Sequence, residues 1–343
     1  MKKQVLTLFC FLSLALSFAQ NKKMAGFYPD YSTVGINNVQ YSKLTDIFYA
    51  FVFPNATGVL YSKNASYNDV VVNGSGSRVL TVMKPLADKA NASGVKIHLS
   101  VGGAGGSWGF AATVANAGYR SKMIDSLGAM VARFDLDGVN IDWEFPSSTD
   151  KTNFETFMSV LRTKLNAVGV SEGRTIELSI AVGVGLFDDG AYAVNSSIFS
   201  NVDYVYLMAF DAQGDCCICD VNHHSTTTTA DYVIKKWSSG LTKPAPSCGG
   251  DFNSKGVPKS KLVLGIPFYS NNGSGVNWDG ICASNASTYY NDADGMNGGY
   301  DYNSCPVIQA KTNLIMNTQG GAGIWCWDLD ADREDQYSLL SCI

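Results

Sequence analysis

The stretch FDLDGVNIDWEFP, residues 134–146, carries the most informative pattern in this chain. In a β-strand successive side chains point to opposite faces, so Asn140, Asp142 and Glu144 share one face. Valine, isoleucine and tryptophan fill the other face, which is typical of a strand buried on both sides. Buried carboxyl groups are costly unless they are paired or chemically active. The acidic face therefore predicts a functional site.

The spacing of Asp142 and Glu144 indicates acid–base chemistry. Two residues apart on a strand, the carboxyl groups lie roughly 6 to 7 Å apart, close enough for each to shift the pKa of the other. A general acid with a raised pKa beside a second carboxylate fits this geometry. Spacing alone leaves two alternatives open, which are a metal-binding strand and an acidic strand that caps helices.

Apolar, β-rich segments alternate with helical patterns along the rest of the chain, as in a (β/α)₈ barrel. We predict eight strands, at 24–28, 46–53, 95–101, 137–143, 175–182, 204–210, 261–267 and 322–327. Helices are predicted at 78–92, 120–134, 150–168 and 230–237, with another after Ser304. Active sites of such barrels form at the carboxyl ends of the strands, which is where Glu144 lies.

The amino terminus predicts export. Lys2 and Lys3 precede an apolar run, Val5–Phe18, and a small residue at Ala19, which is the pattern of a secretory signal peptide over residues 1–19. No other apolar run is long enough to span a membrane. We therefore expect a secreted protein, extracellular or periplasmic, with one domain over residues 20–343 and no membrane association after cleavage.

Composition narrows the partners. The formal net charge is −5 and no cluster of basic residues interrupts the chain, which argues against a nucleic-acid partner. Eight of the nine cysteines lie between Cys216 and Cys342, which in an exported chain favours disulfides over a zinc site near His223 and His224. Cys326 is expected to be a buried free thiol or a constrained partner. We expect a monomer without a metal or other cofactor.

Residues 137–144 resemble the Asp-Gly-x-Asp-x-Asp-x-Glu signature of glycoside hydrolase family 18, the chitinases and their endo-β-N-acetylglucosaminidase relatives. One position departs, because Asn140 stands where the family has its middle aspartate. The resemblance covers most of the chain through strand motifs at 25–28, 48–51, 96–103, 204–211, 261–269 and 323–332. It implies an α/β fold, the (β/α)₈ TIM barrel. The fifty or so residues after Tyr269 are too few and too glycine-rich for the full α+β insertion of larger members.

The resemblance also implies catalytic roles. Glu144 would protonate the glycosidic oxygen and later activate water, while Asp142 would orient the substrate's N-acetyl group, whose carbonyl oxygen is the nucleophile of this family. Asp137 would be an inner, hydrogen-bonded member of the same relay, with a purely structural role as its alternative. Because Asn140 adds no charge, we expect Asp142 to ionise more readily than its family counterpart.

Further residues are expected to bind substrate. Phe210 replaces a family tyrosine whose hydroxyl group would donate to the N-acetyl oxygen, and Tyr206 or Tyr269 could supply a hydroxyl group instead. Trp327 is expected to lie beneath the sugar. Trp278 is a further subsite candidate, whereas Trp325 and Trp143 are expected in the core. The predicted substrate-binding set is Trp327, Asp211, Met208, Phe210, Tyr269, Tyr28, Phe51 and Trp108.

Together these features predict a secreted chitinase that hydrolyses β-1,4 bonds of chitin or of N-acetylglucosamine oligosaccharides. Two alternatives remain open at this point. One is an endo-β-N-acetylglucosaminidase that cuts the chitobiose core of N-glycans by the same chemistry. The other is an inactive chitin-binding lectin, which Phe210 favours and which Asp142 and Glu144 disfavour. The shorter insertion indicates an open cleft and endo cleavage.

Overall fold

A computed structural model describes most of the chain. The described residues are 22–63, 69–185, 190–212, 223–243, 251–271, 275–290, 296–297 and 300–343. The predicted signal peptide lies outside them, as do Cys216, Cys217, Cys219 and Cys248.

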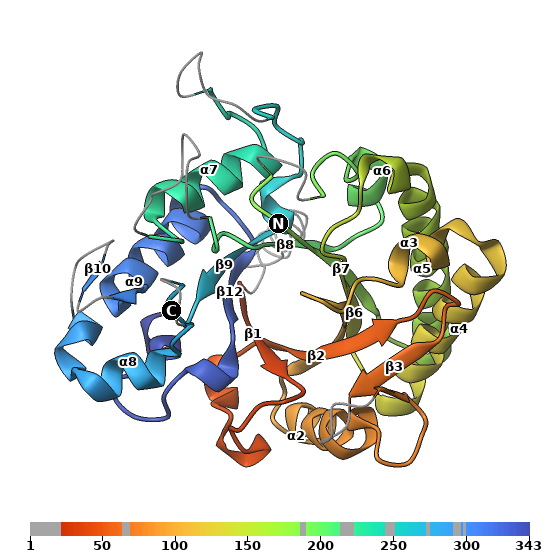
Figure 1. Ribbon diagram of the computed structural model, residues 1–343, viewed down its shortest axis with the longest axis horizontal. Helices are drawn as coiled ribbons and strands as arrows, with labels where there is room; N and C mark the ends of the chain where they lie inside the picture. The colour runs from red at the N-terminus through yellow and green to blue at the C-terminus, as the bar shows by residue number, and fades with distance from the viewer. Residues whose placement is uncertain are drawn as a thin grey trace, which may run out of the picture.

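Eight parallel strands close into a barrel (Figure 1). They are β1 (Lys23–Pro29), β2 (Asp46–Pro54), β5 (Lys96–Gly102), β6 (Gly138–Asp142), β7 (Glu177–Val182), β8 (Tyr204–Leu207), β9 (Leu262–Pro267) and β12 (Gly323–Trp327). Neighbours in sequence order pair in parallel, and β1 closes the ring by pairing with both β2 and β12. The predicted fold class and all eight predicted strands are confirmed.

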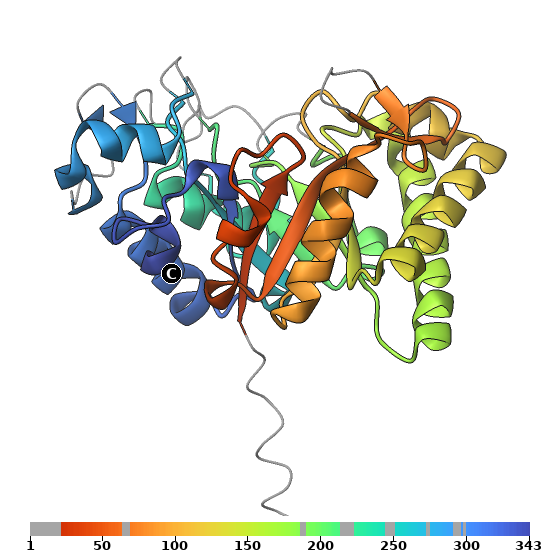
Figure 2. The ribbon, with the colours of Figure 1, turned by 90° about the horizontal axis from the view of Figure 1, so that it is seen from below.

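Helices surround the barrel (Figures 1 and 2). They are α2 (Lys84–Ala92), α3 (Phe110–Ala115), α4 (Ala117–Phe134), α5 (Lys151–Glu172), α6 (Ser196–Phe199), α7 (Thr227–Trp237), α8 (Trp278–Ser284) and α9 (Cys305–Asn313). The longest, α5, buries an apolar stripe at helical spacing against the barrel, with Phe154, Leu161 and Leu165 among its buried residues. Pro306 occupies the first turn of α9, where its missing N–H costs nothing.

Aromatic side chains fill the barrel interior. Phe27 stacks on Phe48 with ring centroids 4.8 Å apart and contacts Trp325 at 4.7 Å. Tyr206 meets Phe48 edge-on at 4.8 Å and is fully buried. These rings fill one side of the barrel interior, and the polar side chain of His98 stacks on Phe48 at 4.5 Å beside them.

The floor of the barrel, at the amino ends of the strands, holds a buried ion network. The Lys23 ammonium lies 2.6 Å from Asp46 and 2.9 Å from Glu177, and His98 Nε2 lies 2.9 Å from Asp46. Burial alone would lower the pKa of Lys23, but the two carboxylates raise it above its usual value. Asp46, His98 and Glu177 could also hold a metal ion by their spacing, but Lys23 already pairs with both carboxylates.

Two features add to the predicted elements. The strands β3 (Leu60–Lys63) and β4 (Asp69–Val71) extend β2 in antiparallel fashion beyond the barrel. Between β9 and β12, the described residues form α8, a 3₁₀ turn (Ala286–Tyr290), the short pair β10 (Met296–Asn297) and β11 (Tyr300–Asp301), and α9. This is not a full α+β subdomain, as the segment length predicted.

The described cysteines give a partial disulfide pattern. Cys305 in α9 is bonded to Cys342, which ties α9 to the end of the chain. Cys282 and Cys326 are buried free thiols, as predicted for Cys326. Within the ranges described above, no helix has the length and apolar character needed to cross a membrane.

Candidate active site

Strand β6 delivers the acidic residues to the carboxyl end of the barrel. Asn140 pairs with Ser100 of β5 and with Ser179 of β7 in the ladder, and its side chain points into the barrel. The same alternation points Asp142 and Glu144 inward, one and two steps further along. Asp142 is 3% exposed, whereas Glu144 follows the strand and is half-buried.

The loop after β5 fixes this strand end. The backbone N–H of Gly103 donates to the Asp142 carbonyl at 2.7 Å, and Ser107 Oγ donates to the same carbonyl at 3.1 Å. Ser107 Oγ also accepts the backbone N–H of Glu144 at 2.9 Å. Gly102 has φ 109° and a Cβ there would lie 2.2 Å from the Asp142 carbonyl oxygen, so this close approach requires glycine.

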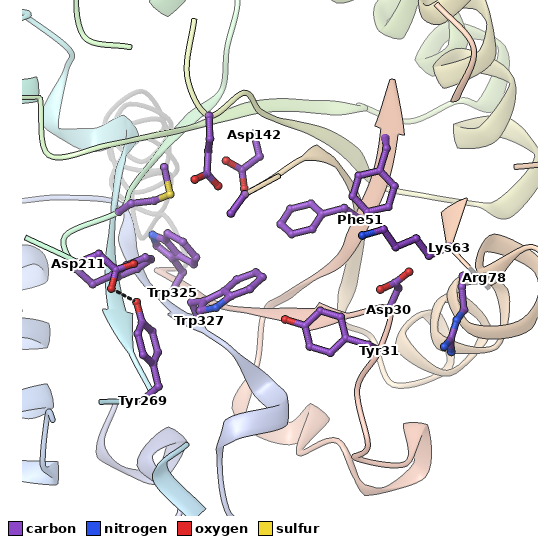
Figure 3. A pocket seen from close by; sticks show the side chains of 15 residues that line it. Asp30, Tyr31, Phe51, Lys63, Arg78, Asp142, Asp211, Tyr269, Trp325 and Trp327 are labelled. Carbon is purple, nitrogen blue, oxygen red and sulfur yellow. Dashed lines mark hydrogen bonds between the residues drawn. The ribbon is translucent and has the colours of Figure 1, made fainter. Parts of the chain in front are cut away.

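A cavity of about 360 Å³ opens above Asp142 (Figure 3). Among the predicted site residues it brings together Phe51, Asp142, Glu144, Met208, Phe210, Asp211, Tyr269 and Trp327. Its walls also contain residues that were not predicted for the site, namely Asp30, Tyr31, Phe53, Lys63, Arg78, Ala104 and Trp325. The cavity thus gathers side chains from β2, β3, β6 and β12 and from the residues that directly follow β1, β5, β6, β8 and β9.

Asp142 and Glu144 share a strongly perturbed environment. Burial, followed by the charge and hydrogen bond of Glu144, raises the pKa of Asp142 well above its usual range. Burial, followed by the charge of Asp211, raises the pKa of Glu144 to about 7. Oδ1 of Asp142 is buried and has no hydrogen-bond partner in the described structure. The pair therefore holds a proton near neutral pH, which suits a general acid.

Asn140 is bound sideways beneath this pair. Its Oδ1 accepts from Ser100 Oγ at 2.9 Å, and its Nδ2 donates to Ser179 Oγ at 3.0 Å. The amide thus bridges β5 and β7, and its described N–H bond goes to Ser179, not to Asp142. The expectation that Asn140 eases ionisation of Asp142 stays a prediction, because it compares this site with one that has aspartate at position 140.

Asp137 does not join this group. Strand alternation turns it outward, where its carboxylate accepts from the Ile97 backbone N–H at 2.9 Å and pairs with Arg174 at 3.3 Å. Both partners lie at the amino edge of the barrel. The expected inner place in a relay is therefore corrected to the structural alternative, in which Asp137 ties β5 to the end of α5.

Asp211 lines the same cavity as Glu144, close enough for its charge to raise the pKa of that carboxyl. It follows β8 with a left-handed backbone, φ 56°, and its carboxylate accepts from Tyr269 Oη at 2.7 Å and from Asn271 Nδ2 at 2.8 Å. His224 Nδ1 lies 3.3 Å from the same carboxylate and is buried behind it. Burial, then the charge of Asp211, raises the pKa of Tyr269 well above its usual value, so the phenol stays protonated and donates.

The aromatic residues divide into wall and core. Trp327 is half-buried and faces Phe51 with ring centroids 5.7 Å apart. Phe210 contacts Trp325 edge-on at 5.4 Å and brings no hydroxyl group to the cavity. Trp325 is 1% exposed, as a core residue should be, yet its edge still lines the cavity. Of the two tyrosines proposed to replace the missing hydroxyl, Tyr269 lines the cavity and Tyr206 does not.

Two aromatic predictions are wrong. Tyr28 is 3% exposed, and its hydroxyl donates to the Val34 carbonyl at 2.6 Å on the outer side of the barrel. The inward residue of that strand is its neighbour Phe27. Trp278 is 1% exposed in the core, where its indole N–H donates to the Tyr337 carbonyl at 2.9 Å.

Trp108 lies outside the main cavity. It is 63% exposed and borders a second, open hollow of about 360 Å³ together with Phe145 and Asp150. Glu144 lines both spaces. Glu144 thus stands at the junction between this cavity and a more open groove.

His224 and Asn271 were missed by the sequence reasoning, as were the residues at the far end of the cavity. The pair His223-His224 belongs to a cysteine-rich segment, which drew attention to zinc or disulfides instead. Asn271 is a common loop residue in a glycine-rich stretch. Neither His224 nor Asn271 lies in a strand or helix, so no sequence periodicity indicates that it lies beside Asp211.

The geometry defines a class of protein: a (β/α)₈ barrel with a carboxyl pair and aromatic walls at the catalytic end, as sugar-processing barrels have. The comparisons make the family explicit. The model of "Glycosyl hydrolases family 18" matches residues 23–332, and the chain belongs to this family.

Similar proteins bear chitinase names. Endochitinase 1 of Metarhizium anisopliae is 26% identical over 345 residues, covering 87% of this chain and 78% of that protein. A GH18 chitinase from the chitin utilization locus of Flavobacterium johnsoniae superimposes with a TM-score of 0.72 at 22% identity, covering 95% and 93% of the two chains. A chitinase-like agglutinin from Robinia pseudoacacia superimposes with a TM-score of 0.69 at 23% sequence identity, covering 93% of this chain and 97% of the agglutinin. At these identities the structural likenesses establish the fold alone.

Proposed function

We propose that this chain is an exported chitinase that hydrolyses β-1,4 bonds between N-acetylglucosamine units with retention of configuration. The observation that carries the proposal is the pair Asp142 and Glu144, with raised pKa values, at the floor of a cavity walled by Trp327. Residues 1–19 would direct export and residues 20–343 would form one catalytic domain that acts as a monomer.

In the first step, the protonated Glu144 carboxyl donates its proton to the glycosidic oxygen as the bond to the anomeric carbon breaks. The carbonyl oxygen of the substrate's own N-acetyl group forms a new bond to that carbon, which gives an oxazolinium ion. Asp142 lies two residues away on the same face and orients the N-acetyl N–H. Its carboxylate stabilises the positive charge that develops on the ring.

In the second step, the Glu144 carboxylate takes a proton from water, and the hydroxide attacks the anomeric carbon and opens the oxazolinium ring. The acid regains its proton and the sugar keeps its configuration, because two inversions have occurred at one carbon. Trp327 offers its flat face to the apolar C–H surface of the sugar. Asp211, held by Tyr269 and Asn271, faces the acetamido group from the other wall.

The stereochemistry of the product tests this mechanism. Proton NMR recorded during the first minutes of hydrolysis should show the β-anomer of the new reducing end before mutarotation. Release of the α-anomer would rule out attack by the N-acetyl group. The variant Glu144→Gln keeps the shape of the side chain but cannot donate a proton, and we expect it to lose at least a thousandfold in kcat.

A second candidate function, a chitin-binding lectin, is favoured by one observation. Phe210 replaces the tyrosine at the cavity wall and removes a hydrogen bond that would form to a developing charge. A lost bond of this kind costs about 1.5 to 3 kcal/mol, or roughly ten- to a hundredfold in rate. Binding of chitin oligomers without any turnover by the unaltered protein would support the lectin.

A further inference from the structure

Three charged residues meet at the end of the cavity that is remote from Asp211 (Figure 3). Asp30 follows β1, Lys63 ends β3, and Arg78 directly precedes the π-helical turn Val79–Met83. All three line the cavity, and Tyr31 lies beside them. The group thus depends on the β3–β4 extension, which brings Lys63 over the barrel rim.

These charges are not paired with one another. The described structure contains no ion pair between Asp30 and either Lys63 or Arg78, although both cations are close enough to lower the pKa of the Asp30 carboxyl. Burial outweighs them and raises that pKa to about 6. Asp30 is only 5% exposed, and both its Oδ2 and Arg78 Nε are buried without a hydrogen-bond partner in the described structure.

Unpartnered buried polar groups are costly, so a ligand that forms hydrogen bonds with this cluster would be favoured. The opposite end of the cavity contrasts with it, because Asp211 there accepts bonds from Tyr269 and Asn271. A packing role for the charged end is disfavoured for the same reason, since a structural ion cluster would be paired. The three side chains instead present one acceptor and two donors to the cavity.

Sugar hydroxyl groups match this arrangement, because each can donate one hydrogen bond and accept others. A carboxylate accepts two hydroxyl donors, and ammonium and guanidinium groups donate to hydroxyl or ring oxygens. With Asp30 ionised, the three groups sum to one positive charge, which disfavours a cationic amino sugar. Lys63 Nζ also lies 5.0 Å from the centre of the Phe53 ring, and this cation–π contact favours the position of the ammonium group at the cavity.

We propose that Asp30, Lys63 and Arg78 form a polar subsite for the hydroxyl groups of an uncharged hexose or N-acetylhexosamine unit, remote from the cleaved bond, and that this subsite discriminates against a deacetylated unit. The inference rests on the proposed function, because the proposed mechanism sets the direction in which the sugar chain runs through the cavity. Asp142 must hold the acetamido group of the sugar that is attacked. The chain on the non-reducing side therefore extends along the cavity toward Asp30, and the leaving group occupies the Trp108 groove.

The test uses aryl β-glycosides of N-acetylglucosamine oligomers of increasing length. The aryl group occupies the leaving-group side, so each added sugar extends only toward Asp30. We expect Asp30→Asn and Arg78→Gln to lower kcat/KM at least tenfold on the longest glycosides and to leave the shortest within twofold. Asp88→Asn, which removes an exposed carboxylate of α2, is the matched control and should change neither.

A second readout addresses discrimination. Replacing the terminal N-acetylglucosamine of the longest glycoside by glucosamine should lower kcat/KM of the unaltered protein, and Arg78→Gln should narrow that difference. If Arg78 had only a structural role, Arg78→Gln would leave the difference in kcat/KM between the two terminal sugars unchanged. An equal loss of kcat/KM at every glycoside length, or no loss at any length, overturns the proposal.

Binding separates this inference from the proposed function. If no glycoside is hydrolysed, the chitinase proposal fails, and titration calorimetry with the hexasaccharide then decides the subsite. Affinity that falls at least tenfold in Asp30→Asn but not in Asp88→Asn supports the subsite on a non-hydrolytic protein. Equal affinity of Asp30→Asn and the unaltered protein overturns it.

Discussion

At the scale of single residues, the ionisation of Glu144 is expected to control the activity of the site. A general acid works only while it holds its proton, and burial together with Asp211 raises the pKa of Glu144 to about 7. We therefore expect kcat/KM to fall as the pH rises through about 7. Asp211→Asn removes the negative charge that raises this pKa, so the basic limb should move to lower pH.

The pH–rate profiles of the unaltered protein, Asp211→Asn and the charge control Asp88→Asn measure this effect. Loss of Asp211 should also lower the rate, because its carboxylate is proposed to contact the substrate, but only the position of the limb reports on Glu144. An unmoved basic limb in Asp211→Asn would show that Asp211 does not act on Glu144.

Asn140 gives a second prediction about ionisation. Asn140→Asp places a second carboxyl beneath Asp142, and like charges disfavour joint ionisation, so the acid limb of the profile should move to higher pH. Ser179→Ala is the matched control, because it removes the hydrogen bond from Asn140 Nδ2 without adding charge. The idea that Asn140 eases ionisation of Asp142 fails if the profile of Asn140→Asp matches that of the unaltered protein.

Phe210 gives the third prediction. Phe210→Tyr adds a hydroxyl group at the cavity wall, and a regained bond to the N-acetyl oxygen should raise kcat/KM about tenfold or more. Tyr206→Phe is the control, because Tyr206 is buried below the cavity and its hydroxyl has no hydrogen-bond partner in the described structure. Steady-state kinetics on one chitin oligomer compares the variants, and equal rates for Phe210→Tyr and the unaltered protein would contradict the role given to this position.

At the scale of elements, the glycine turn after β5 holds the acidic strand in place. Gly102→Ala would strain a backbone with φ 109° and put a methyl group against the Asp142 carbonyl. Gly105→Ala also places alanine at a positive φ, 72°, which is closer to the left-handed region that alanine can adopt, and its added methyl group meets nothing within 4 Å. This variant shows what a positive φ in the same loop costs when β6 is not displaced.

We expect Gly105→Ala to lower the free energy of unfolding by about 1 kcal/mol and to retain activity. Gly102→Ala should lose more stability and at least tenfold in kcat, because the Asp142 carbonyl must move. Chemical denaturation gives the free energy of unfolding of each variant, and steady-state kinetics gives its kcat. Similar activities of Gly102→Ala and Gly105→Ala would mean that the turn does not position β6.

Alternation along strands explains what the sequence could and could not predict. Along β6 only one face is polar, so the inward direction of Asp142 was evident, and the same alternation turns Asp137 outward. Along β1 both faces carry aromatic residues, so the pattern did not distinguish Phe27 from Tyr28. The subsite residue Lys63 could not be predicted, because it ends a short strand with no clear period. Arg78 could not be predicted either, because it lies in a connection before Val79–Met83 and belongs to no strand of the barrel.

At the scale of the whole molecule, Glu144 stands between the cavity and a more open groove. The cavity has room for sugars on the side of Asp30. On the other side, the groove is bordered by Trp108, whose side chain is 63% exposed. A chain of sugars can lie across both spaces, which favours cleavage within the chain. The barrel and its family were predictable from the order of strand motifs, whereas this two-sided shape required the packed structure.

The central claim is that Glu144 cleaves bonds between N-acetylglucosamine units in this cavity. Mass spectrometry of the products from N-acetylglucosamine tetramer to hexamer, with the unaltered protein and Glu144→Gln side by side, tests it most directly. The account predicts dimers and trimers from the unaltered protein and intact oligomers from Glu144→Gln. Intact oligomers from both proteins, or equal products from both, would contradict it.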